Sequence, residues 1–197
     1  MPPRLTGNTN SGASRRLVMA GAAGALAGFG LWPALASAAS ASELSADGAA
    51  ALQKLYSQSE KARQLGRKAR AILVFPSITK AGFMVGGQGG QGVLFVDRQP
   101  VGYYSLYAGS FGLQIGAQKF SYALFFITQS ALDYLKKSQG WAIGSGPSVV
   151  VIDQGKAKTM NTTTLSQDVY AFPFGQKGLM AGLGLEGSKI TPIHPNA

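Results

Sequence analysis

A glycine-rich segment is the first candidate for chemistry in this chain. Gly87-Gln88-Gly89-Gly90-Gln91-Gly92 matches G-x-G-x-x-G, the pattern that cradles the phosphates of a dinucleotide. That site needs a helix directly after the glycines and an acidic residue about 20 positions later. Here residues 93–96 (VLFV) are typical of a strand, and the next acid after Asp97 is Asp133. We therefore expect a glycine-rich turn or bulge with positive φ angles rather than a nucleotide site.

Side chains suited to catalysis or metal binding are sparse. The chain has no cysteine and a single histidine, His194, three residues from its end, so a zinc site or a Ser-His pair would depend on that tail alone. The acids from residue 97 onward are scattered singly: Asp97, Asp133, Asp153, Asp168 and Glu186. Glu186 is interpreted as structural, pairing a buried lysine or capping backbone amides. These residues indicate a protein that is not an enzyme and carries no cofactor or metal.

Basic side chains are the group best placed to bind a partner. Eighteen Lys and Arg face eight Asp and Glu, for a formal net charge of +10. Such a charge favours anionic partners, either nucleic acid or a membrane surface. The tyrosines Tyr103, Tyr104 and Tyr107 are not interleaved with arginines as in a single-strand platform, which argues against nucleic acid.

Many of these charges fall on an expected helical segment, residues 51–71, that follows a helix start near Ser42. At about 100° per residue one side is apolar: Leu52, Leu55, Ala62, Leu65 and Ala69. Basic residues flank it on both sides: Lys54, Lys61 and Lys68 on one, Arg63, Arg67 and Arg70 on the other. This pattern suits a helix at a membrane interface. The spacing alone favours the alternative, in which the apolar side packs on the domain and the charges are solvated. Gly66 is expected to split the segment into two helices.

The first 38 residues have the order of a secretory signal. Arg15 and Arg16 stand in a twin-arginine-like motif, residues 17–39 carry no charge, and Ala36 and Ala38 offer small residues for cleavage. We expect cleavage to leave a single domain, residues 39–197, in a periplasmic or exported location at the membrane periphery. An uncleaved transmembrane anchor is the alternative.

The rest of the chain predicts an α+β fold. Strand-like runs are closely spaced and no long helix separates them: residues 71–76, 82–85, 93–96, 101–106, 111–116, 122–128, 141–144, 148–153, 169–174 and 178–185. Residues 129–137 predict one short helix, residues 156–164 a polar hairpin arm, and the remainder a Pro-containing tail. Such spacing indicates an antiparallel sheet curled into a sandwich or partial barrel, preceded by the amphipathic helix or helices.

Four motifs resemble the SYLF domain, and the similarity runs from about residue 51 to 190. They are residues 71–76 (AILVFP), 80–83 (KAGF), 89–92 (GGQG) and 177–188 (KGLMAGLGLEGS). Residues 172–175 (FPFG) depart from the Tyr-Ser-like residues usual before the last block. SYLF domains occur in eukaryotic actin-patch and endocytic adaptors and in bacterial exported proteins.

The resemblance implies lipid binding, partly through an amphipathic N-terminal helix. The expected lipid-binding residues are Lys54, Lys61, Arg63, Arg67, Lys68, Arg70 and Lys80. Because eukaryotic members bind phosphoinositides and an exported protein does not meet them, the expected partner is another anionic phospholipid, such as phosphatidylglycerol or cardiolipin. The alternative is a cell-envelope scaffold or adaptor that binds another protein, without catalysis.

Overall fold

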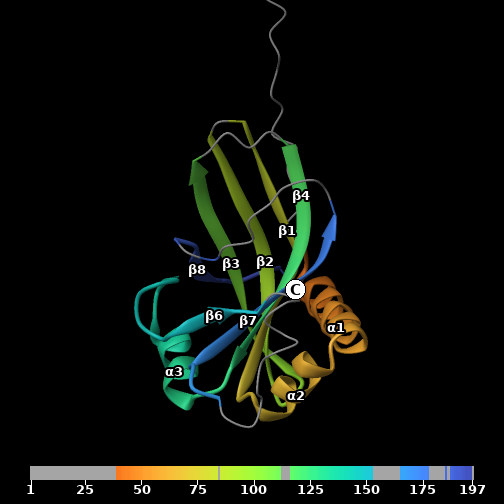
Figure 1. Cartoon of the computed structure of the whole chain (residues 1–197), viewed down its shortest axis with the longest axis vertical. Helices are drawn as coiled ribbons and strands as arrows, with labels where there is room; N and C mark the ends of the chain where they lie inside the picture. The colour runs from red at the N-terminus through yellow and green to blue at the C-terminus, as the bar shows by residue number, and fades with distance from the viewer. Residues whose placement is uncertain are drawn as a thin grey trace, which may run out of the picture. The chain divides into compact units, whose positions relative to one another are not determined.

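One curled sheet of eight strands organises the described part of the chain (Figure 1). The computed structural model describes residues 39–83, 85–111, 116–152, 165–177, 185 and 187–196. The strands are β1 (Ala71–Phe83), β2 (Val85–Val96), β3 (Gln99–Phe111), β4 (Gly116–Phe126), β5 (Trp141–Ala142), β6 (Val149–Val151), β7 (Val169–Lys177) and β8 (Lys189–Ile193). Their order is β5-β8-β3-β2-β1-β4-β7-β6, antiparallel throughout except for the parallel pair β6–β7. The predicted α+β class with a curled, half-barrel sheet is confirmed.

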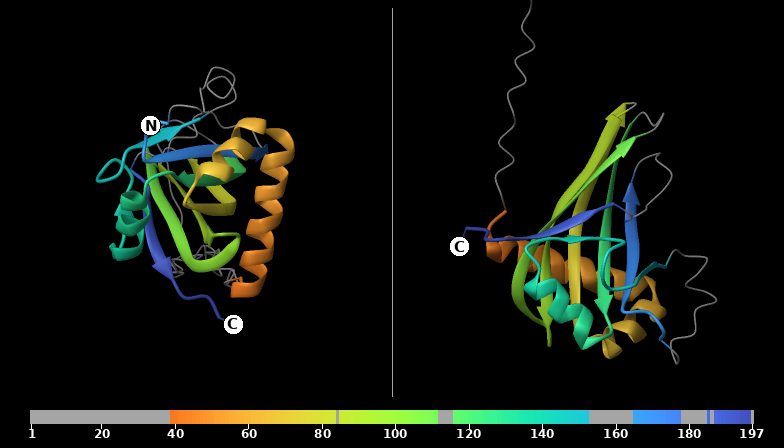
Figure 2. Two further views of the ribbon diagram at one scale, coloured as in Figure 1. Left: turned by 90° about the horizontal axis from the view of Figure 1, so that it is seen from below. Right: turned by 90° about the vertical axis from the view of Figure 1, so that its left-hand side faces the viewer.

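Three helices flank this sheet. Helices α1 (Ala41–Gln58) and α2 (Glu60–Lys68) lie on one side, and α3 (Gln129–Lys137) lies on the other (Figure 2). The bounds of α3 are those predicted, and Thr128 caps it, with its hydroxyl accepting from the Ala131 amide at 3.3 Å. A capping box between Ser40 and Glu43 starts α1, close to the predicted start. The three helices and the sheet belong to one compact unit, Ser37–Ala197.

The glycine-rich segment is a strand, so the predicted turn or bulge is wrong. Residues 86–92 lie inside β2, paired with β1 on one side and β3 on the other, and none of these glycines has a positive φ. Close approach explains their composition. A Cβ at Gly92 would stand 2.6 Å from the Phe75 ring and 2.7 Å from the Val74 carbonyl oxygen. The glycines therefore leave room for β1 and Phe75 to lie against β2.

The sequence suggested that Pro76 ends its strand, but the strand continues past it. Strand β1 continues to Phe83, with a register shift against both neighbours around Pro76. A bulge is where a strand tolerates proline, which has no amide hydrogen to donate. The carbonyl oxygen of Pro76 at this bulge accepts a side-chain hydrogen bond instead, since Ser121 Oγ donates to it at 2.7 Å.

Two further strand predictions need correction, and several others lie outside the described residues. The run at 101–106 extends into one long strand, β3, and β8 forms where a tail was expected, although Pro192 lies within it. The undescribed predictions are the signal at 1–38 with Arg15 and Arg16, residues 112–115, the arm at 156–164, residues 178–184, Asp153 and Glu186.

Strand alternation buries apolar residues on both faces of the sheet. In β4, Phe120, Tyr122 and Leu124 join the cluster that α3 and Trp141 cover from the inner side of the curl. Ala123 and Phe125 point the other way, into the cluster shared with α1 and α2. Helices α1 and α2 therefore depend on the sheet's outer face for their burial.

Asp168 joins three elements on the α3 side. Its carboxylate accepts hydrogen bonds from the Thr128 hydroxyl at 2.9 Å and from the Ser148 amide and hydroxyl, each at 2.9 Å. The start of α3, the start of β6 and the start of β7 are thus held by one anion. The Ser148 and Thr128 donors lower the pKa of Asp168 below its ordinary value of 3.8.

Replacing Gly92 with alanine should destabilise the fold by about 2 kcal/mol, because the new methyl group overlaps the Val74 carbonyl and the Phe75 ring. Gly109→Ala is the matched control, since a Cβ there meets nothing within 4 Å. Urea unfolding of both variants measures the difference. Equal midpoints for the two would contradict the close packing of β1 on β2.

Asp168→Ala should lower the free energy of unfolding by about 1 kcal/mol at pH 7, because the hydrogen bonds to Thr128 and Ser148 are lost while water can replace part of them. Because the folded-state pKa of Asp168 is depressed, the stability it contributes is present above about pH 4 and is lost as the pH falls through the folded pKa. The gap between wild type and variant should therefore close in acid. Asp133→Ala, which removes one hydrogen bond with Gln129 on α3, is the control. A gap that stays constant down to pH 2 would refute the assignment.

Candidate functional site: an arginine-rimmed cleft

An open cleft of about 1010 Å³ lies where α1 and α2 meet the start of β1 and the end of β2. Its apolar lining comes from Leu52, Tyr56, Ala69, Ile72 and Phe95. Its basic lining comes from Arg63, Arg67, Arg70 and Arg98, with Asp97 the acid among the lining residues. Four arginines and a set of apolar side chains, called the floor below, therefore line one cleft.

Helix α2 owes its position to a break at Ser59. This residue has an extended backbone (φ −142°, ψ 107°), ends α1, and accepts from the Ala62 amide at 3.2 Å as the cap of α2. The predicted split at Gly66 is wrong, because Gly66 lies within α2. Ala62 and Leu65 are fully buried. Burial of that side turns Arg63 and Arg67 outward.

The predicted apolar strip packs on the sheet. Leu55, Ala62 and Leu65 are buried in one cluster with Phe125 and Phe172. Leu55, Ala62 and Leu65 therefore have no apolar side free, whereas Leu52 and Ala69 are half-buried and line the cleft described above. The alternative that the spacing favoured, an apolar side packed on the domain, is what the structure has.

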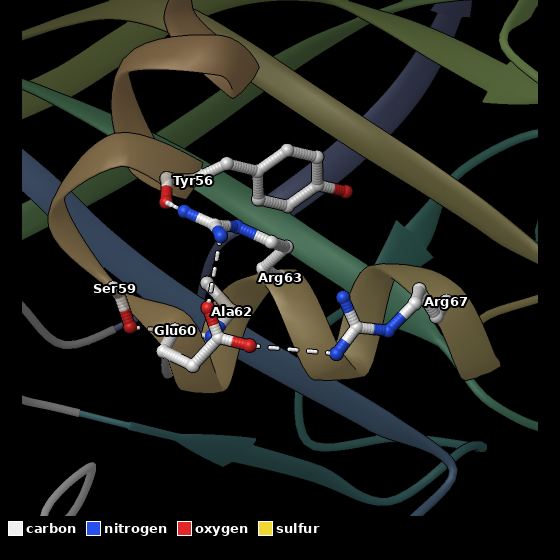
Figure 3. A network of polar contacts seen from close by, with 6 residues as sticks. All are labelled: Tyr56, Ser59, Glu60, Ala62, Arg63 and Arg67. Carbon is white, nitrogen blue, oxygen red and sulfur yellow. Dashed lines mark hydrogen bonds and ion pairs between the residues drawn. The ribbon is translucent and has the colours of Figure 1, made fainter.

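Glu60 links two of the arginines (Figure 3). Its carboxylate lies 3.1 Å from Arg63 Nη1 and 3.4 Å from Arg67 Nη2, and Arg63 Nη2 also donates to the Tyr56 carbonyl oxygen at 2.8 Å. The side chains are 48% exposed at Arg63, 61% at Arg67 and 54% at Glu60. Ion pairs this exposed contribute about 0–1 kcal/mol, so both guanidinium groups can exchange Glu60 for a ligand anion at little cost.

Tyr56 lies between the two helices. A Cβ at Gly66 would overlap the Tyr56 hydroxyl, so glycine is what allows the ring to lie against α2. Burial raises the pKa of Tyr56 to about 12, and the charge of Arg98 opposes that rise. Like an ordinary tyrosine, Tyr56 is protonated at neutral pH, so its hydroxyl can donate a hydrogen bond at the cleft.

Arg98 is a site residue that the sequence analysis missed. It follows Asp97 in the two-residue turn between β2 and β3, and both residues have positive φ, 49° at Asp97 and 67° at Arg98. Two positive φ angles are typical of a type I′ hairpin turn, where the second position favours glycine. An arginine there carries a backbone cost of about 1–3 kcal/mol, a kind of strain that clusters at functional sites. The sequence did offer one signal for this turn: Asp97 and Arg98 are polar residues between two strand-like runs, 93–96 and 101–106.

The structure brings together three of the seven predicted lipid-binding residues. Arg63, Arg67 and Arg70 line the cleft, whereas Lys54, Lys61 and Lys68 lie on the same helices without lining it. Lys80 lies elsewhere, 7% exposed in β1, with Gln88 and Gln118 as its partners across the sheet. Lys80 therefore cannot share a ligand with the cleft arginines.

The described residues offer little for other chemistry. They contain no group of three or more His, Cys, Asp or Glu side chains placed to hold a metal ion. His194 is exposed in the tail, as its position predicted. Among the described helices, none combines the length and apolar character needed to cross a membrane.

Comparison with known proteins supports the predicted resemblance. Residues 107–194 match the Ysc84 family model, described as Las17-binding protein actin regulator, which is the SYLF domain. No curated protein matches the chain. The cleft-lining residues all precede the matched segment, so the cleft must be judged on its own geometry.

Proposed function

We propose that this chain, whose residues 107–194 match the SYLF family model, docks on anionic phospholipid surfaces through the arginine-rimmed cleft. The family is associated with lipid binding or actin-related roles. The observation that carries the proposal is the convergence of Arg63, Arg67, Arg70 and Arg98 around one open cleft with an apolar floor.

The chemistry of the rim suits lipid phosphates. Guanidinium groups bind phosphate through paired N–H donors, and each basic side chain near an anionic bilayer contributes about 1 kcal/mol. The partly exposed floor residues Leu52 and Ile72 offer apolar surface below the headgroups. Docking in this form leaves α1 and α2 folded on the sheet, which differs from the insertion of a free helix.

The lipid and the compartment form part of the proposal. A twin-arginine signal at Arg15 and Arg16 would deliver the folded chain to the periplasm, where phosphatidylglycerol and cardiolipin are the anionic lipids. Attachment would then be peripheral. The charge of the chain after residue 38 stays positive, since residues 1–38 carry three arginines and no acid.

A second candidate function is that of an envelope scaffold or adaptor. The matched family model is described by its binding to a protein, Las17, and its match covers the second half of the chain. Tyr107 in that half is 66% exposed on β3, a residue type enriched at protein interfaces. This function would use surfaces other than the cleft and would need no catalysis.

Neutralising Arg63, Arg67 and Arg70 together with glutamine should weaken binding to phosphatidylglycerol liposomes about a hundredfold, from about 1 kcal/mol per residue. Co-sedimentation of residues 39–197 at several salt concentrations measures the effect, with binding of the parent protein falling as salt rises. The matched control neutralises three exposed lysines far along the chain: Lys119, Lys136 and Lys137.

Equal losses in the two triple variants would show that net charge, not the cleft, drives binding. Equal sedimentation with neutral and anionic liposomes would contradict the electrostatic mechanism. A protein partner captured by cross-linking equally well with both variants would favour the adaptor function.

Glu60→Gln should strengthen binding to the same liposomes, by up to about fivefold, because it frees Arg63 and Arg67 from a competing carboxylate. Asp133→Asn on α3 makes the same change of charge away from the cleft and should have little effect. The ratio of the two affinities, measured at one salt concentration, tests whether these arginines meet the lipid. Weaker binding by Glu60→Gln than by Asp133→Asn would contradict the proposal.

A further inference from the structure

We propose that the cleft holds one molecule of an anionic amphiphile, with its charged group on the arginines and its alkyl chain along the apolar floor. This inference rests on the proposed function and narrows it. Docking on a bilayer needs only a charged patch, whereas a ligand held singly needs a hollow with a charged part and an apolar part. The open cleft is lined by both kinds of side chain.

Its size and lining both point to a single ligand. A volume of about 1010 Å³ is at the upper end of the roughly 300–1,000 Å³ of small-molecule sites, which are mostly apolar with a few placed polar groups. The floor residues Leu52, Ile72 and Phe95 come from α1, β1 and β2. Three elements therefore contribute to one apolar surface on which an alkyl chain could lie. A ligand with charge alone would leave this floor wet, and an uncharged one would leave the arginines unused.

The charged end is built from separate elements that the fold holds in place. Arg63 and Arg67 stand on α2, Arg70 follows it, and Arg98 comes from the β2–β3 turn. Two carboxylates oppose these four guanidinium groups, Asp97 in the cleft lining and Glu60 beside Arg63 and Arg67, so positive charge dominates. Tyr56 adds a hydroxyl donor, and its ring lies against α2 at Gly66. These groups match a phosphate or carboxylate at the end of an alkyl chain.

The test uses decyl phosphate at concentrations where it is monomeric, titrated into residues 39–197 by calorimetry. One-to-one saturable binding is expected, at least tenfold tighter than that of inorganic phosphate or of the uncharged amphiphile decyl maltoside. Ala49→Phe should block the floor and weaken binding at least tenfold, because Ala49 lines the cleft. Ala50→Phe adds the same ring at an exposed neighbouring position on α1 that does not line it and should bind like the parent.

Arg98→Asn tests the charged end independently, since asparagine tolerates the positive φ of this turn. It should also weaken decyl phosphate binding while leaving the thermal midpoint unchanged or higher. Circular dichroism confirms folding, and if Ala49→Phe does not fold, the Arg98→Asn result decides. Binding that is unchanged in the folded variants, or that appears only above the micelle concentration, overturns the inference.

Liposome sedimentation of the same samples separates this inference from the proposed function. Protein that sediments with phosphatidylglycerol liposomes but does not bind monomeric decyl phosphate docks on surfaces only, and the single-ligand site is then wrong. Protein that binds decyl phosphate one to one but ignores liposomes has the site without the docking function. If the protein neither sediments with liposomes nor binds decyl phosphate, both the docking function and the single-ligand site are wrong.

Discussion

The burial of one side of α1 and α2 against the outer face of the sheet is the interaction on which the rest depends. Leu55, Ala62 and Leu65 pack with Phe125 and Phe172, and this contact fixes which side of α2 faces outward. Burying each leucine or phenylalanine side chain stabilises by about 1.5–3 kcal/mol, more than the exposed ion pairs of Glu60 contribute. Apolar packing therefore positions the arginines, and electrostatics acts only through them.

Packing of backbone against side chain shapes the sheet that supports this contact. The glycines of β2 let Phe75 and the bulge at Pro76 approach, so β1 reaches the cleft floor through Ala71 and Ile72 at its start. The turn between β2 and β3 places Arg98 at the same cleft. The cleft is thus a product of strand topology as much as of the two helices.

Sequence patterns within a few residues predicted much of this structure. Features that depend on contacts between residues far apart in the sequence were missed. The helix Gln129–Lys137 and the start of α1 follow from caps and apolar spacing within a few residues. The glycines of β2 looked like a turn because the side chain that requires them, Phe75, is a neighbour only in the folded sheet. Arg98 joins Arg70 for the same reason: only strand pairing brings residues this far apart in sequence to one cleft.

The central claim is that the cleft arginines meet anionic lipid headgroups while the helices stay on the sheet. The most direct measurement is a residue-resolved NMR comparison of residues 39–197 with nanodiscs of phosphatidylglycerol and of a neutral lipid. The account predicts that signals of Arg63, Arg67, Arg70 and Arg98 change with the anionic lipid alone, with those of buried Leu65 retained. Changes confined to the surface around Tyr107, or loss of the α2 signals on release from the sheet, would contradict it.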